Sequence, residues 1–207
     1  MWKNNRRFRN TAVAVTAESP VTRREILEYA AIGAGAAATA ALAVPKAKAA
    51  PHYLRGLGDF RQLNLVNHRT AERLNVVYYV DGEYIPDAVD EVSYLMRDWR
   101  RNEIMPMDAR TLDIVAAMYK HLDVSEPLQV VSGYRSPATN DLLRRKGRGV
   151  AKNSFHTRGM AVDLSLQSRS VGKMYKAALS CRAGGVGRYT RNHFIHVDCG
   201  PQRTWGR

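Results

Sequence analysis

The chain has 207 residues, enough for one ordinary domain and a leader, and its composition, 45% hydrophobic and 25% charged, is that of a folded protein. The net charge of +13 favours an anionic partner, but the basic residues are scattered and lack interleaved aromatic residues. Binding to an anionic polymer therefore stays open, whereas nucleic acid is not expected as a partner. The two cysteines, Cys181 and Cys199, exclude a four-cysteine zinc site and allow either one disulfide or two buried thiols.

The first 49 residues carry the pattern of an export signal. Arg23 and Arg24 precede an apolar run rich in Ala and Gly at 30–44, and "AKA" ending at Ala49 has the small-x-small form of a cleavage site. The run is shorter than the about 20 residues that span a bilayer, so no stable membrane span is expected. We predict a twin-arginine signal peptide with a basic N-terminal extension over 1–49, cleaved near Ala49, and a periplasmic protein; a buried N-terminal helix is the alternative.

Residues 50–207 are expected to form one domain that begins with a hairpin and two helices. Two strands are predicted, one from the alternation of apolar and polar residues in "RQLNLVN" and one from the β-branched and aromatic residues of "LNVVYYV". Asp81-Gly82 predicts a turn. Apolar residues at helical spacing, including Trp99, predict a helix over 86–102. A second helix is predicted over 108–122, with Asp108 as its N-cap.

The second half of the domain mixes short strands and helices. Strands are predicted at 128–131, 160–166 and 193–200, helices from Pro137 to about Gly147 and over 170–181, and a turn at "AGGVGRY", 183–189. This pattern indicates an α+β fold in which two to four helices pack on a small, mainly antiparallel sheet.

A candidate metal site follows from the apolar strand that contains Asp163. A buried carboxylate needs a partner, and its own strand offers no basic residue on the same face. In "FIHVD" the alternation of a strand puts His196 and Asp198 on one face. If the two strands are neighbours, Asp163 and His196 face one cleft, and His156, held by the turn at Gly159, can join them. Two imidazoles and a carboxylate with an open fourth position suit a catalytic zinc.

Several motifs in this region carry a resemblance to a known family. They are "RDWR", "SGYRSPATN", Ser154-x-His156 followed by Gly159, Ala161 and Asp163, "GVGRY", and "HVDCGPQRTW" with His196. In these motifs the chain resembles the zinc peptidases of bacterial cell walls, which include D-alanyl-D-alanine carboxypeptidases, VanX-type dipeptidases and murein endopeptidases and share a hedgehog-like α+β fold. It is most similar to an exported, Gram-negative branch secreted by the twin-arginine pathway.

The resemblance implies a role for individual residues. It assigns one zinc ion to His156, Asp163 and His196, and it assigns Arg135 to stabilising the oxyanion of the scissile carbonyl. Many relatives carry Glu or Asp as general base three residues before the last histidine ligand, where this chain has His193. We expect His193 to act as the base, with Asp198 as the competing candidate or as a residue that orients a ligand. Ser154 is expected to bind substrate, and three further candidates either contact substrate or stabilise their turn: Ser132, Tyr134 and Ser136.

The expected function is zinc-dependent hydrolysis of peptide bonds in peptidoglycan. Two alternatives stay open, a catalytically silent peptidoglycan-binding module that contains zinc and a D-alanyl-D-alanine carboxypeptidase. The expected partners are peptidoglycan and, through the signal, the twin-arginine translocation machinery. The sequence leaves open which bond is cut.

Overall fold

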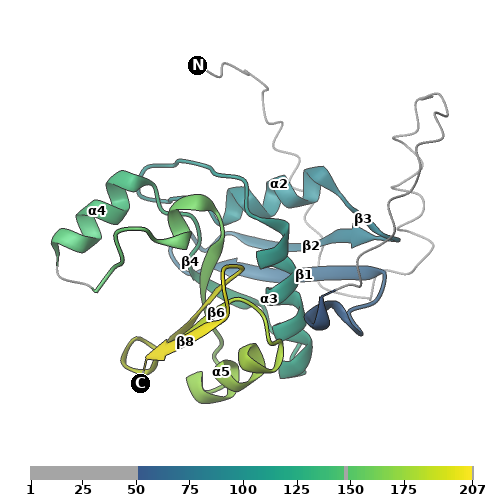
Figure 1. The fold of residues 1–207 in the computed structure, drawn as a ribbon. Helices are drawn as coiled ribbons and strands as arrows, with labels where there is room; N and C mark the ends of the chain where they lie inside the picture. The colour runs from purple at the N-terminus through teal and green to yellow at the C-terminus, as the bar shows by residue number, and fades with distance from the viewer. Residues whose placement is uncertain (1–50, 147–148, 207) are drawn as a thin grey trace. The chain divides into compact units, whose positions relative to one another are not determined.

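A computed structural model describes residues 51–146 and 149–206 (Figure 1). The predicted signal peptide and its cleavage site lie outside the described residues. Among the helices that are described, none has both the length and the apolar character needed to cross a membrane.

One eight-stranded sheet forms the centre of the domain, with the strand order β3-β2-β1-β4-β5-β7-β6-β8. Neighbours are antiparallel except in the pairs β1·β4 and β6·β8, which are parallel. The strands are β1 (Phe60–Asn67), β2 (Arg73–Val80), β3 (Glu83–Tyr84), β4 (Leu128–Ser132), β5 (Ala161–Ser165), β6 (Gly185–Tyr189), β7 (Phe194–Asp198) and β8 (Arg203–Gly206). The predicted α+β fold with a mainly antiparallel sheet is confirmed.

In the part of the chain that the structure describes, four α-helices accompany this sheet, within the predicted number. They are α2 (Pro86–Leu95), α3 (Ala109–Leu122), α4 (Pro137–Arg145) and α5 (Val171–Ser180), and three short 3-10 turns join them, η2 (His52–Leu54), η3 (Phe155–Arg158) and η4 (Thr190–Asn192). Helix α2 packs on β2, α3 on β1 and β7, and α5 on β6 and β7. The predicted N-cap is confirmed, because the Asp108 side chain accepts a hydrogen bond from the backbone N–H of Arg110.

The apolar core lies between the sheet and helices α2, α3 and α5. On the two central strands it takes Val162 and Leu164 from β5 and Ile195 and Val197 from β7, all fully buried. Residues between them, such as Asp163, must point to the opposite face of the sheet because side chains alternate along a strand. The core therefore fixes which polar side chains reach the other face.

The predicted helix over 86–102 is wrong in its length. Helix α2 ends at Leu95, because the Met96 carbonyl accepts a hydrogen bond from the backbone N–H of Tyr134 and Asp98 starts a turn that closes on Glu103. Trp99, which the periodicity placed inside, is 38% exposed. Hydrogen bonds to a distant loop thus end a helix whose apolar spacing would have continued.

The turn predicted at 183–189 is also wrong over most of its length. Gly184, with a φ of +58°, makes the turn, and Gly185–Tyr189 is strand β6. A Cβ on Gly187 would lie 2.6 Å from the Trp205 ring, so glycine here serves close packing within a strand rather than a turn. The two cysteines are free thiols; Cys181 is buried, as the second alternative above expects, but Cys199 is only partly buried.

Candidate metal and active site

His156 is held by the short turn η3. The Ser154 hydroxyl oxygen accepts a hydrogen bond from the backbone N–H of His156, and Gly159 ends the turn with a φ of +67°. The imidazole is buried, and its Nδ1 lies 2.7 Å from the carbonyl oxygen of Gly133. Since a carbonyl only accepts, Nδ1 carries the proton, and Nε2 presents a lone pair to the site.

Asp163 and His196 lie opposite each other on neighbouring antiparallel strands, as the sequence predicted. Nε2 of His196 lies 2.9 Å from the carboxylate of Asp198, and its Nδ1 lies 2.9 Å from Oδ1 of Asp163. When Asp198 accepts the Nε2 proton of a neutral His196, Nδ1 presents a lone pair to the site.

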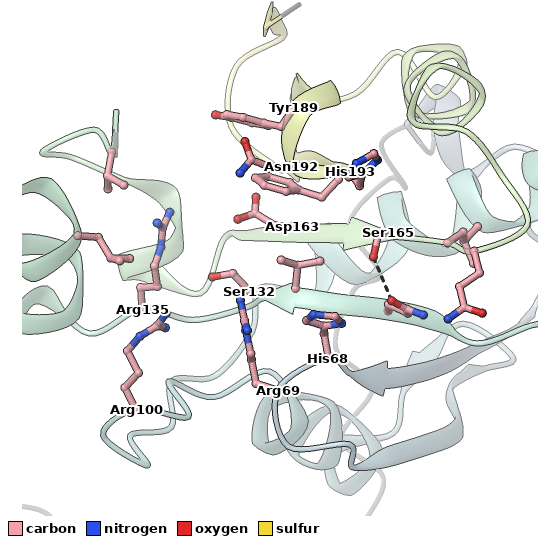
Figure 2. A pocket seen from close by; sticks show the side chains of 17 residues that line it. His68, Arg69, Arg100, Ser132, Arg135, Asp163, Ser165, Tyr189, Asn192 and His193 are labelled. Carbon is pink, nitrogen blue, oxygen red and sulfur yellow. Dashed lines mark hydrogen bonds between the residues drawn. The ribbon is translucent and has the colours of Figure 1, made fainter. Parts of the chain in front are cut away.

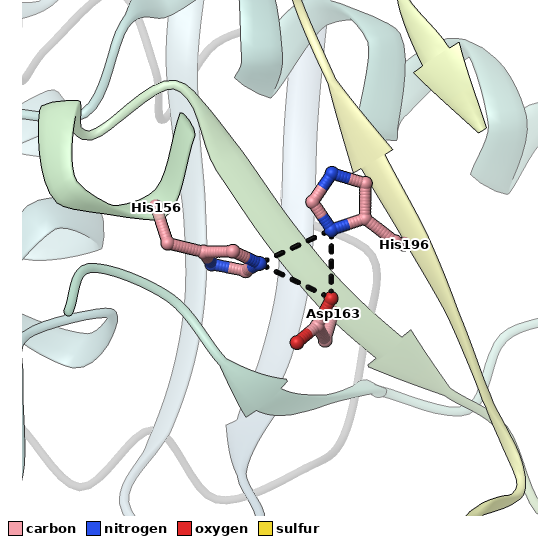
Figure 3. A group of neighbouring side chains, drawn as sticks. All are labelled: His156, Asp163 and His196. Atoms are coloured by element: carbon pink, nitrogen blue, oxygen red, sulfur yellow. Dashed lines mark hydrogen bonds and ion pairs between the residues drawn. The ribbon is translucent and has the colours of Figure 1, made fainter. Parts of the chain in front are cut away.

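The three predicted ligands converge on one point (Figure 3). Nε2 of His156 lies 3.1 Å from Nδ1 of His196 and 3.2 Å from Oδ1 of Asp163. Tetrahedral coordination at metal–ligand distances of about 2.1 Å sets ligand atoms about 3.4 Å apart, close to these values. A proton bridges only two of the three atoms, whereas a metal ion contacts all of them. The residues present therefore fit a metal ion.

The charge states of two of the three groups, Asp163 and His156, suit a cation. Burial raises the pKa of Asp163, but the charges and hydrogen bonds of the two imidazoles outweigh burial and hold that pKa well below its ordinary value. Burial lowers the pKa of His156 and dominates there. It also lowers the pKa of His196, but hydrogen bonds to Asp163 and Asp198 outweigh it and raise that pKa. An ionised Asp163 beside a neutral His156 matches the forms that bind metals.

Arg135 lies next to this cluster. Its backbone N–H donates to the His156 carbonyl at 3.1 Å, and its Nη2 donates to the Ser154 hydroxyl at 3.2 Å. Within the described chain its buried Nε has no hydrogen-bond partner. Burial lowers the pKa of the guanidinium below its ordinary value of 12.5. The side chain points into the cavity (Figure 2) and offers donors to a ligand there.

A cavity of about 480 Å³ opens above the cluster (Figure 2). Of the predicted residues, Asp163, Arg135, Ser132 and His193 line it. His193 is exposed, with a φ of +56°, and lies on the wall that also carries Tyr189 and Asn192.

The other predicted residues lie in supporting positions. Ser136 caps α4 and donates its hydroxyl to Asp98, while Tyr134 is buried and ties its loop to Met96 through the backbone. Ser154 caps η3. These contacts are those of loop-stabilising residues, the alternative left open for Tyr134 and Ser136.

Asp198 is fully buried and does not line the cavity among the described residues. Besides His196, it accepts hydrogen bonds from the Arg203 guanidinium and from the backbone N–H groups of Gly185 and Gly200. These four partners fix the carboxylate and, through it, the ring of His196.

The cavity also holds residues that were not singled out from the sequence. They include Arg69 and His68 after β1, Arg100 after α2, Tyr189 at the end of β6, and Asn192 before β7. Two of them, Arg100 and Tyr189, lie within the motifs "RDWR" and "GVGRY", which were the available signal. Arg69 and His68 lie in no such motif.

A mixed sheet that carries Asp163 and His196, with His156 beside them and a cleft at the cluster, is the arrangement expected of hedgehog-like peptidases. Comparison with known families agrees: residues 56–205 match the family model of M15-type peptidases described as "Peptidoglycan L,D-endopeptidase MepK". The chain belongs to this family of peptidoglycan endopeptidases and is a hydrolase. Zinc dependence is general among M15 peptidases.

Individual relatives agree with the family. The chain is 40% identical over 145 residues to "Peptidoglycan L,D-endopeptidase MepK" of Escherichia coli K12, which covers 70% of this chain and 80% of that protein. It is 39% identical over 146 residues to the "Probable peptidoglycan L,D-endopeptidase MepK" of Haemophilus influenzae, and this match covers 70% of this chain and 78% of that protein.

Proposed function

We propose that this protein is a zinc-dependent endopeptidase that hydrolyses an L,D peptide bond in peptidoglycan cross-links. The observation that carries the proposal is the convergence of three ligand atoms, from His156, Asp163 and His196, within 3.2 Å of one another beneath a cleft. Family membership supports the substrate class, and the names of the relatives support the L,D bond.

The side chains divide the chemistry among them. His156, Asp163 and His196 would hold the zinc ion, which supplies a Lewis acid and lowers the pKa of water to about 7. Arg135, already aimed into the cleft, binds the carbonyl oxygen and stabilises the negative charge that develops there during attack. His193 at the rim takes a proton from the attacking water and passes it to the leaving amine. Asp198 orients His196.

Digestion of purified sacculi and of isolated cross-linked muropeptides tests this proposal, with products read by mass spectrometry. Conversion of cross-linked dimers to monomers that stops with a chelator and returns with zinc is the expected result, and the product masses identify the bond. Release of D-alanine alone would instead show a carboxypeptidase.

The silent peptidoglycan-binding module left open by the sequence is the outcome against which the enzyme is tested, and family membership favours the enzyme. The presence of His193 where many relatives have a carboxylate is the observation that favours the module. This candidate predicts that the zinc-loaded protein is retained on sacculi but releases no new amino termini from them. The same digest therefore separates it from the enzyme.

The proposed site of action is the periplasm, reached by the twin-arginine pathway. The support is the sequence of residues 1–49 and the location of peptidoglycan outside the cytoplasm. Replacing Arg23 and Arg24 by lysine should leave the protein in the cytoplasmic fraction, whereas the unchanged chain is recovered from the periplasm. Equal export of both chains would contradict the assignment.

A further inference from the structure

One wall of the cleft carries positive charge that the hydrolytic chemistry does not use. Arg69, Arg100 and His68 line the cleft together with Arg135 and face Tyr189, Asn192 and His193 across Asp163 (Figure 2). Among the described residues that line the cleft, Asp163 is the only carboxylate. Its charge faces His156 and His196, and the side chains that line the opposite wall include the guanidinium groups of Arg69 and Arg100.

Strand pairing brings Arg69 close to the reacting centre. It follows β1, whose last residue, Asn67, pairs with Val130 of β4, and Ser132 of β4 pairs with Asp163 of β5. With strands about 4.8 Å apart, the end of β1 lies about 10 Å from β5, within reach of an arginine side chain. The Asn67 carboxamide oxygen accepts hydrogen bonds from the backbone N–H groups of Arg69 and Thr70 and fixes this turn.

Arg100 is placed by two side chains of its own loop. One oxygen of the buried Asp98 carboxylate accepts the backbone N–H of Arg100, and the other accepts the N–H and hydroxyl of Ser136, next to Arg135. The Arg97 guanidinium binds the Glu72 carboxylate at 2.8 Å, which ties the same loop to the turn of Arg69. The loops that carry the three arginines are thereby fixed relative to one another.

The chemistry of this wall selects its ligand. Arg69 and Arg100 are exposed in the cleft, and the guanidinium of Arg100 rests 4.3 Å from the centre of the Trp99 ring. Guanidinium groups bind carboxylates through paired, charge-assisted hydrogen bonds. A peptide with a free carboxylate near the scissile bond would complement both arginines while its carbonyl meets Arg135.

We propose that Arg69 and Arg100 form a carboxylate-binding subsite that selects substrates with a free carboxylate beside the scissile bond. The inference rests on the proposed function. An L,D bond joins the carbonyl of an L-centre to the amine of a D-centre. Where that D-centre belongs to diaminopimelate, its own carboxylate is free and its carbon is two bonds from the scissile nitrogen. The subsite binds this group.

The test compares two synthetic cross-linked peptides with the full, zinc-loaded chain. They are identical except that the D-centre bears a carboxylate in one and a neutral carboxamide in the other. The unchanged enzyme should prefer the acid by about tenfold or more in kcat/KM, because a hydrogen bond to a charged group is worth that factor. Arg69→Gln and Arg100→Gln should each reduce this preference, and Arg100→Lys should retain part of it.

Arg55→Gln, which removes an exposed charge that does not line the cleft, is the matched control and should keep the full preference. Equal cleavage of acid and amide by the unchanged enzyme would overturn the subsite and leave the endopeptidase intact. An equal loss of activity on both peptides in Arg69→Gln and Arg100→Gln would also overturn it, since that result indicates a structural role. Failure of the unchanged enzyme to cut either peptide would refute the proposed function itself.

Discussion

The carboxylate of Asp198 lies 2.9 Å from Nε2 of His196, on the side of the ring that faces away from Asp163. This contact decides which nitrogen of the His196 ring faces the proposed metal site. Because Arg203 and the backbone N–H groups of Gly185 and Gly200 hold the carboxylate in turn, the start of β6 and the bend from Gly200 to Arg203 support the proposed metal site. A carboxylate behind a ligating histidine fixes its tautomer and makes it a stronger ligand.

Replacing Asp198 by asparagine should weaken zinc binding by about 10- to 100-fold. The amide cannot accept every hydrogen bond that the carboxylate accepts, and the charge behind His196 is lost. Competition with a chromogenic chelator measures the affinity. Asp90→Asn, at an exposed position of α2, is the control. A folded Asp198→Asn protein with unchanged zinc affinity would show that Asp198 does not orient a ligand.

Asp163→Asn should abolish both zinc binding and hydrolysis, because Asp163 is the one carboxylate of the proposed metal site among the described residues. Free zinc at about 100 times its dissociation constant should raise the free energy of unfolding of the unchanged protein by about 2.7 kcal/mol. Chelation should remove this gain, and Asp163→Asn should not show it. Thermal unfolding with and without zinc measures the difference. An equal shift in both proteins would place the metal elsewhere.

The sequence predicts much of this candidate site because two of its three proposed ligands, Asp163 and His196, lie in strands with a clear period. Val162 and Leu164 alternate with Asp163, and Ile195 and Val197 alternate with His196. The local pattern therefore predicts that Asp163 and His196 point to the face of the sheet opposite the core. The positions of Arg69 and Arg100 in the wall of the cleft could not be predicted in this way. Arg69 reaches the cleft through a parallel pairing of β1 with β4, and nothing near residue 69 encodes that long-range contact.

Two predictions from the sequence, the helix over 86–102 and the turn at 183–189, are wrong for the same reason. Apolar spacing through Trp99 favours a longer helix, but Asp98 is drawn into hydrogen bonds with Ser136, 38 residues away. The glycines of β6 suggest a turn, yet Gly187 makes room for the ring of Trp205 from a strand that follows later in the chain. In both places a distant partner outweighs the local preference.

Arg135→Lys should lower kcat by about 10²- to 10³-fold with a smaller change in KM, since the guanidinium acts on charge that develops in the transition state. Lysine keeps the positive charge but loses the planar pair of donors. Steady-state kinetics on an isolated cross-linked muropeptide measures both constants. Arg158→Lys, an exposed position in η3 that does not line the cleft, is the matched control. An unchanged kcat would remove Arg135 from the chemistry.

Replacement of His193 by asparagine tests the general base. Asparagine tolerates the left-handed backbone that this position adopts, so the rim should keep its shape while the imidazole is lost. If His193 moves the proton, kcat should fall by about 10²- to 10⁴-fold, and added free imidazole should restore part of it. His121→Asn, at an exposed position of α3, is the control. Full activity in His193→Asn would assign the proton transfer to another group.

Asp98→Asn should destabilise the domain in a pH-dependent way. Burial raises the pKa of this carboxyl, but hydrogen bonds from Thr139, Ser136 and the Arg100 backbone outweigh burial and lower it below 3.8. The ionised form therefore adds stability above the unfolded pKa of about 3.9, and this is lost as the pH falls through the folded pKa. At pH 7 the variant should be less stable by about 1–3 kcal/mol, and the gap should shrink below about pH 4. Urea unfolding from pH 7 to pH 2.5 measures it, and a gap that stays constant would show that the Asp98 charge is not the cause.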